Sequence, residues 1–286
     1  MQPSIVFDST FPLASVKTRD YAAPFDITAA RAALVVAHPS HELRLYRWLQ
    51  LSRPGVFVLT DGSGRAGQSR LNATTHLLAD VGATPGTIYG RMTDAESYAA
   101  MLRKDVNLFV ALAVELAEAF ERGRIEYVAG DAVEGYNSTH DVCRLVINAA
   151  VALINKHRSN RIANFDFPVV GKPDDCPPDM RAQAIQVWLD EKMLERKLTV
   201  ARCYHPSVAS DVEKAVNEIG IDAFRTEWLR PIADGRSYNS APEGVPFYEA
   251  HAAKQVAAGH YTSVVSYREH IAPIADALGE YVEGRA

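Results

Sequence analysis

A short and entirely apolar run at residues 32–37 (AALVVA) is the feature that most limits the folds open to this chain. A run without polar alternation is typical of a strand that is buried on both faces. Strands of that kind belong to parallel sheets that are covered by helices on each side. We therefore expect the chain to be built around a parallel sheet.

Helical and strand patterns alternate after this run. The helical spacing of apolar residues over 41–52 stops at Pro54-Gly55, and residues 56–60 (VFVLT) predict a second strand. The remaining patterns predict helices over 69–81, 98–122 and 140–156, and strands over 86–90 and 125–129. Alternation with short links predicts an α/β fold with a doubly wound, mostly parallel, Rossmann-like sheet and helices on both faces.

The alternation weakens after about residue 157. Residues 164–178 read as a surface loop and 231–250 show little periodicity, whereas helices are expected near 179–203, 208–219 and 264–283. We expect a single α/β domain over 1–286, with a core at 31–157 and a C-terminal elaboration at 158–286.

Two histidines directly follow the first strand. His38 and His41 lie three residues apart, at the place where ligands bind in open α/β folds. Such a pair can bind one metal ion. The alternative is a helix N-terminus in which Ser40 caps the backbone and the histidines are incidental.

A third histidine belongs to another strand end. Asp61 follows the second strand, and the polar loop 130–141 supplies His140 at the start of a predicted helix. These ends meet on one face of a doubly wound sheet. Three histidines with an open fourth position are typical of catalytic zinc, so we expect Zn²⁺ or another divalent metal at His38, His41 and His140.

The order of these motifs resembles the PIG-L (LmbE-like) zinc-dependent N-acetylglucosaminyl deacetylase family. Its A-H-P-D-D-E run corresponds to residues 37–42 (AHPSHE), and its T-D-G motif corresponds to Thr60-Asp61-Gly62. Arg70 and the segment to Val81-Gly82 follow the family's next helix, and residues 137–140 (NSTH) stand where H-P-D-H is expected. The similarity covers roughly residues 31–157 and is faint around 197–204 and Glu227. It implies the same fold and zinc-dependent deacetylation.

The departures concern the groups that carry the chemistry. Ser40 replaces the aspartate that acts as general base in the family, and a serine hydroxyl does not take up a proton near neutral pH. His41 replaces the second aspartate, a metal ligand, and imidazole keeps that ability. Asn137 replaces the histidine that polarises the substrate carbonyl; it can donate a hydrogen bond but not a proton.

Two routes to activity remain. Three neutral imidazoles leave zinc its full charge, which can lower the pKa of bound water to about 7. In the other route, a carboxylate elsewhere in the site acts as the general base. The candidates, each of which could instead be a helix-capping acid, are Glu42, Asp61, Asp131, Glu134 and Asp141. The expected catalytic groups are Asp61, Asn137 and Asp141.

The leading function is a metal-dependent hydrolase of the N-deacetylase type, acting on an N-acyl amino sugar or a related small molecule. The main alternative is a catalytically degenerate metal- or sugar-binding homologue, and a third is another metal reaction on the same scaffold. The expected substrate-binding residues are Ser40, Glu42, Arg70, Tyr136 and His205. Tyr204, His205 and Glu227 are expected to face the pocket, or alternatively to cap and pack helices.

The composition of the chain limits the classes of molecule that it is expected to bind. The net charge of -5 and pI of about 6.0 argue against nucleic acid and anionic membrane as partners. Neither a membrane-spanning apolar run nor a secretory signal is evident, and three widely spaced cysteines read as reduced thiols. We expect a cytoplasmic protein with a small-molecule substrate, and a homo-oligomer remains open.

Overall fold

The computed structural model describes residues 26–64, 67–232, 244–259 and 262–284. Its strands form one seven-stranded sheet in the order β3-β2-β1-β4-β5-β7-β6. The strands are β1 (Ala32–Val36), β2 (Gly55–Thr60), β3 (Thr84–Met92), β4 (Tyr127–Asp131), β5 (Ala163–Phe167), β6 (Ile185–Trp188) and β7 (Thr226–Pro231). The first five strands are parallel, and β7 is antiparallel to both β5 and β6. The expected fold, a mostly parallel Rossmann-like α/β sheet, is confirmed.

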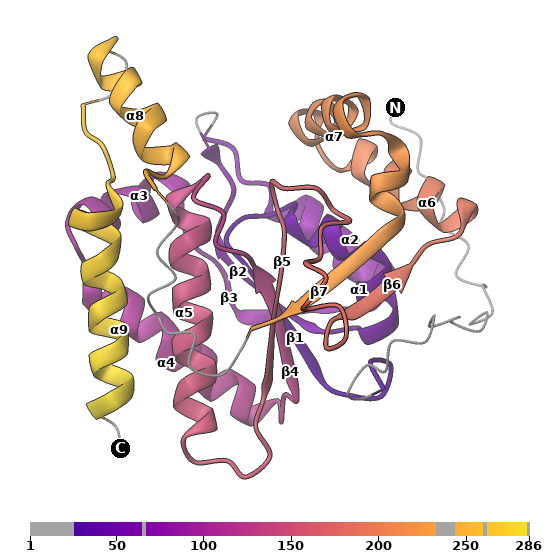
Figure 1. The fold of residues 1–286 in the computed structure, drawn as a ribbon, viewed down its shortest axis with the longest axis horizontal. Coiled ribbons are helices and arrows are strands. Elements are labelled where there is room, and N and C mark those ends of the chain that lie inside the picture. Colours follow the sequence, from indigo (N-terminus) through magenta and orange to yellow (C-terminus); the bar gives the residue numbers. More distant parts are fainter. Residues whose placement is uncertain (1–25, 65–66, 233–243, 260–261, 285–286) are drawn as a thin grey trace.

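Helices cover both faces of this sheet (Figure 1). They are η1 (His41–Leu45), α1 (Tyr46–Ser52), α2 (Leu71–Val81), α3 (Asp94–Leu102), α4 (Val106–Arg122), α5 (Ser138–Asn155), α6 (Glu191–Tyr204), α7 (Pro206–Ile219), η3 (Ile221–Arg225), α8 (Phe247–Ala257), η4 (Tyr267–Ile271) and α9 (Ala272–Gly284). In the described parts of the chain, no helix is long and apolar enough to cross a membrane.

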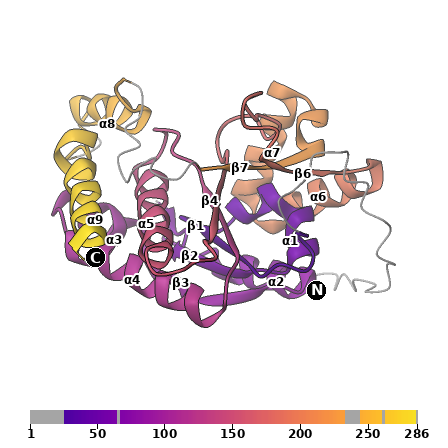
Figure 2. The ribbon, with the colours of Figure 1, turned by 60° about the horizontal axis from the view of Figure 1, so that its bottom comes forward.

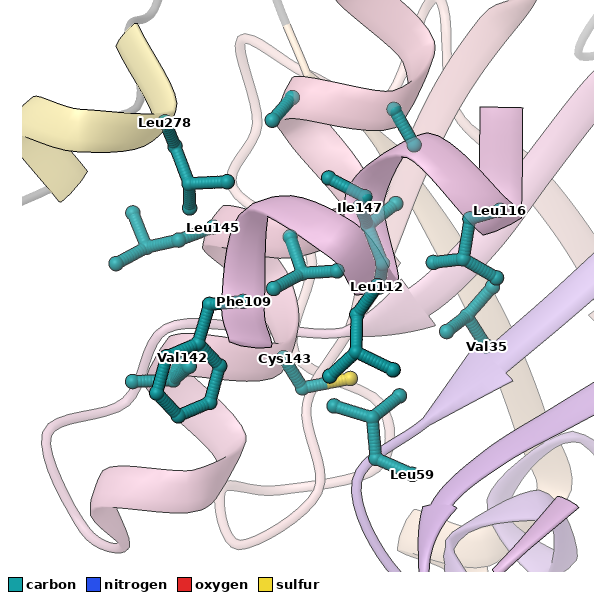
Figure 3. Close-up of a cluster of buried hydrophobic side chains, with 14 of the residues drawn as sticks. Val35, Leu59, Phe109, Leu112, Leu116, Val142, Cys143, Leu145, Ile147 and Leu278 are labelled. Carbon is teal, nitrogen blue, oxygen red and sulfur yellow. The ribbon is translucent and has the colours of Figure 1, made fainter. Parts of the chain in front are cut away.

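The two faces of β1 explain why its sequence has no polar alternation. Ala33 and Val35 pack into a core with α4, α5 and α9, part of which is drawn in Figure 3. Leu34 and Val36 pack into a second core with α1, α2 and α6. The strand is fully shielded on both sides, so it fixes the middle of the sheet and the position of whatever follows it.

The chain changes direction across the sheet between β1 and β4. These two strands are neighbours, but the chain builds β2 and β3 on one side of β1 and continues from β4 on the other side. In a doubly wound sheet the carboxyl ends of strands at such a switch point form a crevice for ligands. The residues that follow β1 and β4 are therefore the first to consider for a site.

Several local expectations were wrong. The helix expected over 98–122 is two helices, α3 and α4, separated at Lys104, whose φ of 55° breaks the helical path. The loop expected at 164–178 contains most of β5, and the segment expected as a helix over 179–203 contains β6 before α6 begins at Glu191. Of the stretch expected to lack periodicity, residues 233–243 lie outside the described ranges, and α8 begins at Phe247.

Candidate metal and substrate site

Three imidazole rings meet at the carboxyl edge of the sheet. His38 follows β1, His41 opens η1, and His140 lies in the first turn of α5. The ring centroids are 5.3 Å apart for His38 and His41, 5.1 Å for His38 and His140, and 4.5 Å for His41 and His140. The fold thus brings together two histidines of one loop with a third that is about a hundred positions further along the chain.

The backbone between the first two histidines makes a sharp turn. Ser40 has a φ of 91° and its side chain makes no capping hydrogen bond to η1. Its amide donates instead to Glu42 Oε2 at 2.8 Å. The alternative interpretation, in which the Ser40 hydroxyl caps a helix, is therefore wrong.

A carboxylate orients His38. Asp94 Oδ1, at the start of α3, lies 2.9 Å from His38 Nδ1, and Thr60 Oγ1 lies 2.7 Å from the same nitrogen. Burial by itself would raise the pKa of Asp94, but hydrogen bonds from His38, Thr60 and the Gly64 amide outweigh it and lower that pKa. Asp94 therefore stays ionised and accepts a hydrogen bond from Nδ1–H, which leaves Nε2 of a neutral ring with its lone pair.

A second carboxylate orients His41. Asp131 ends β4 and is fully buried; its Oδ2 lies 2.8 Å from His41 Nδ1 and accepts the Ala37 amide at 2.8 Å. A histidine that gives one ring N–H to a carboxylate and keeps the other nitrogen free is the usual arrangement behind a metal ligand. His38 and His41 both have it.

Two ring nitrogens of the cluster are buried without a hydrogen-bond partner, His38 Nε2 and His140 Nδ1. Burial lowers the pKa of both histidines, and the neighbouring imidazoles add to the effect. Both effects favour the neutral form of His38 and His140. An unpartnered buried nitrogen is costly, and a bound cation would remove that cost.

The distances between the three rings are suited to a bound metal ion, but the present orientation of the rings is not. Zinc–nitrogen bonds of about 2.0–2.1 Å in tetrahedral geometry place ring centroids about 5 Å apart, near the spacings of this cluster. However, no group of three or more His, Cys, Asp or Glu side chains in the described ranges is already arranged to hold a metal ion. Binding would therefore require the rings to turn within the cluster.

The histidines lie in the wall of an open cavity of about 1050 Å³. One flank is formed by the α8 side and is aromatic and polar, with Tyr136, Phe247, Tyr248 and His251. The other is formed by α6, α7 and η3 and is largely aliphatic. Figure 2 shows α8 and α7 on opposite sides of the strands, with α5 between them.

Several expected substrate-binding residues line this cavity. Ser40, Arg70 and Tyr136 are among them, as is the expected catalytic residue Asn137. Asn137 caps α5, since its Oδ1 accepts the Thr139 amide at 2.8 Å. Its Nδ2 is then the group left to donate, beside the positive end of the α5 dipole.

Glu42 and His205 do not line the cavity. Glu42 is completely buried and accepts hydrogen bonds from the Ser40 amide and the Tyr204 hydroxyl. His205 caps α7 through Nδ1 and Ser207. Of the two expectations for Tyr204 and His205, the structure follows the one in which they pack and cap, because the first supports Glu42 and the second ends one helix and starts another.

The carboxylates proposed as displaced bases are bound elsewhere. Asp61 accepts from the Ser63 amide and hydroxyl, Glu134 accepts from three amides at 169–171, and Asp141 accepts from the amides of Glu134 and Gly135. Burial raises the pKa of Asp141 to about 7. None of them lines the cavity, so the expected roles of Asp61 and Asp141 as catalytic carboxylates are corrected to capping of their own loops.

Sequence reasoning missed two residues that line the cavity. Asp94 lies in Thr93-Asp94-Ala95-Glu96, where Thr93 and Glu96 form a capping box, so it reads as an ordinary acid of a first helical turn. Arg44 donates through Nη2 to the Val169 carbonyl, while its buried Nη1 has no partner. Burial lowers the pKa of Arg44 to about 10, which still leaves it charged at neutral pH.

No family model matches the chain, and no curated protein matches it. A solved structure of a deacetylase triple mutant involved in the teicoplanin biosynthetic pathway is similar at 12% sequence identity and a TM-score of 0.42. The match covers 73% of this chain and 100% of that one. A similarity at this level carries no argument about function, which therefore rests on the site itself.

Proposed function

We propose that the chain is a metal-dependent amide hydrolase of the N-deacetylase type that acts on an N-acyl amino sugar or a related small molecule. The observation that carries the proposal is the convergence of His38, His41 and His140 on one cavity wall. The ring nitrogens of His38 and His140 that have no partner are the best reason to expect a cation among them.

The residues behind the rings support the same interpretation. Asp94 and Asp131 accept hydrogen bonds from Nδ1 of His38 and His41, which leaves Nε2 of each ring as the nitrogen available to a metal. Three neutral nitrogen ligands with an open position are typical of catalytic rather than structural zinc. When bound, such a metal would supply a Lewis acid for the amide carbonyl and would make water more acidic.

The chain itself supplies orientation and charge stabilisation. Asn137 Nδ2 and the N-terminal turn of α5 present donors and a positive dipole beside His140, where negative charge on a carbonyl oxygen would be stabilised. In the reaction, water adds its oxygen to the carbonyl carbon, the carbon–nitrogen bond breaks, and a proton passes to the leaving nitrogen. The products are a carboxylic acid and an amine.

The sequence resemblance points to the same chemistry. The three histidines occupy the positions of the three metal ligands of PIG-L deacetylases, and Thr60-Asp61-Gly62 occupies that of T-D-G. The order of these motifs is kept over the part of the chain that forms β1 to α5.

One observation favours a second candidate, a binding protein without hydrolytic activity. Ser40 stands in the position of the family's general base, and the carboxylates that line the cavity are Asp94 and Asp211. Asp94 is already bonded to His38 and Thr60, and Asp211 is exposed on α7. Hydrolysis would then depend on the acidity that a metal gives to water.

Release of free amine from N-acylated glucosamines separates the two candidates. The protein is assayed after chelation and after return of Zn²⁺, beside His140→Ala and the control His76→Ala, a histidine that is exposed on α2. We expect activity that depends on zinc in the wild type and in His76→Ala and is absent in His140→Ala. Tight, zinc-dependent binding of the sugars without amine release would support the binding protein instead.

A further inference from the structure

The cavity is larger than an N-acetylated sugar needs. Its volume of about 1050 Å³ lies just above the range of about 300–1,000 Å³ that is usual for pockets of drug-sized ligands. The three histidines lie between its two flanks, so a ligand with its amide at the rings has room on both sides. The two flanks differ in chemistry, and this difference is informative about the ligand.

One flank is suited to a ring with polar substituents. Tyr136 and Phe247 are stacked with centroids 4.8 Å apart and an interplanar angle of 1°, and Phe247 also stacks with His251 at 5.5 Å. Tyr136 and Phe247 remain 46% and 52% exposed and form a contiguous aromatic surface at the cavity, which a ligand ring could cover. Tyr248, Thr262 and Ser263 add hydroxyl groups on the same side.

The opposite flank is largely aliphatic. Leu43, from η1, opens it beside His41, and α6, α7 and η3 continue it with these residues: Leu198, Ala201, Val208, Val212, Ala215 and Phe224. Val212 and Ala215 are half-buried on the face of α7 that lines the cavity. The other apolar residues of this flank are buried to within 2–7% exposure, so the flank is an apolar wall whose length along α6, α7 and η3 exceeds the reach of an acetyl group. Each buried methylene of a longer chain contributes favourably to binding.

Most charged groups of this flank are unsuited to bind a ligand chain that ends in a charged group. One of them, Arg44, could bind a carboxylate, and this can be tested. The buried ammonium of Lys197 is paired with Glu227 at 2.9 Å and with the Arg44 carbonyl at 2.7 Å, and Asp211 would repel a carboxylate. Arg44, through its unpartnered Nη1, is the exception.

We propose that the substrate is an amphipathic amide in which a linear acyl chain, longer than acetyl, lies on the aliphatic flank formed by α6, α7 and η3. This inference rests on the proposed amide hydrolysis and adds the class of acyl group. The amine part, a sugar or another polar ring, then lies toward Tyr136 and Phe247.

The test compares N-acetyl-, N-hexanoyl- and N-octanoylglucosamine, both as substrates, by kcat/KM of amine release, and as ligands, by calorimetry. We expect kcat/KM and affinity to rise by about three- to fourfold for each buried methylene. N-adipoylglucosamine, with the six carbons of the hexanoyl compound and a terminal carboxylate, tests Arg44. A preference for the adipoyl compound would overturn the proposal and assign the flank to an anionic group.

A substitution that fills the aliphatic flank tests the acyl-chain site directly and can be paired with a control on the same helix. Ala215→Phe places a ring on the cavity face of α7, and Asn217→Phe places the same ring on an exposed position of the same helix. We expect Ala215→Phe to lose at least tenfold on the octanoyl compound and little on the acetyl compound, with Asn217→Phe unchanged on both. Thermal unfolding of the variants checks that both remain folded.

The outcomes distinguish this inference from the proposed function. Hydrolysis of N-acetylglucosamine with no gain from longer chains, in rate or in binding, overturns the acyl-chain proposal and leaves the hydrolase intact. Binding that increases with chain length, without release of amine from any compound, overturns the hydrolase and supports the flank as a site for acyl chains.

Discussion

His41 Nδ1 and Asp131 Oδ2 lie 2.8 Å apart although β4 and the β1–η1 loop are separated by 90 positions in the chain. The contact joins the two strands at the switch point of the sheet, and the same carboxylate oxygen accepts the Ala37 amide. Asp131 therefore fixes both the backbone that leads into His38 and the ring of His41. This makes it the most informative residue behind the three histidines.

Replacing this carboxylate should weaken metal binding without unfolding the protein. Asp131→Asn keeps the size of the side chain but lacks the charge that orients His41, and loss of such a partner usually costs 10–100-fold in metal affinity or activity. Competition with a fluorescent zinc chelator measures the affinity, and thermal unfolding serves as the control. Unchanged affinity would show that Asp131 only supports the Ala37 backbone.

Restoring a base should raise activity. Ser40 lines the cavity with a φ of 91°, a conformation that Asp and Asn adopt more readily than most residues. Ser40→Asp is expected to increase amide hydrolysis by about 10²–10⁴-fold, the usual contribution of general base catalysis. Ser40→Asn has nearly the same shape without a base, so it should remain near the wild-type rate. Equal rates in both variants, with metal bound, would mean that no proton acceptor is missing at position 40.

The buried ion pair behind η1 should matter for stability and not for metal binding. Glu227 forms an ion pair with Lys197 at 2.9 Å and accepts hydrogen bonds from the amides of Arg47 and Trp48 at the start of α1. Its side chain is fully buried. Glu227→Ala leaves a buried ammonium unpaired, so we expect a loss of about 3–5 kcal/mol of unfolding free energy. Urea denaturation measures it.

The same substitution at an exposed ion pair is the control. Glu213 pairs with Arg202 on the surface of α6 and α7, where their side chains are 51% and 41% exposed. Glu213→Ala should cost less than about 1 kcal/mol. Equal losses for the two variants would contradict the structural role given to Glu227.

The glycine before Asp131 should tolerate no side chain. A Cβ at Gly130 would lie 2.6 Å from the Val35 carbonyl oxygen and 2.5 Å from Ile147 Cδ1. Since the first contact is with backbone, Gly130→Ala must move β4 against β1, at a cost of about 1–3 kcal/mol. A lower urea midpoint together with weaker zinc affinity is expected, because the shift carries Asp131 with it. A fully stable variant would argue against this close packing.

The sequence predicted the centre of the sheet well and its far edge poorly. The strand β1 is a continuous apolar run, and β2 and β4 are apolar up to their last residues, Thr60 and Asp131, because both faces of these strands are covered. In contrast, β5 carries Asn164 and Asp166, whose partners are Arg144 and Arg230. Such polar positions read as a loop until the tertiary partners are known.

The same reasoning applies to the site. The three histidines follow from strand ends and helix starts, which the sequence pattern places on one edge. Asp94 was missed because its own helix already explains an acid at that position, and its contact with His38 spans 56 residues. His205 follows the alternative expectation of a helix cap, since it directly precedes Pro206 at the start of α7.

Metal stoichiometry of the purified protein tests the central claim most directly. Full-length protein is dialysed against Zn²⁺ and then against metal-free buffer, and its zinc is measured by inductively coupled plasma mass spectrometry beside His38→Ala and His76→Ala. The account predicts one zinc per chain in the wild type and in His76→Ala and none in His38→Ala, with all three folded. Zinc retained equally by His38→Ala, or absent from the wild type, would contradict it.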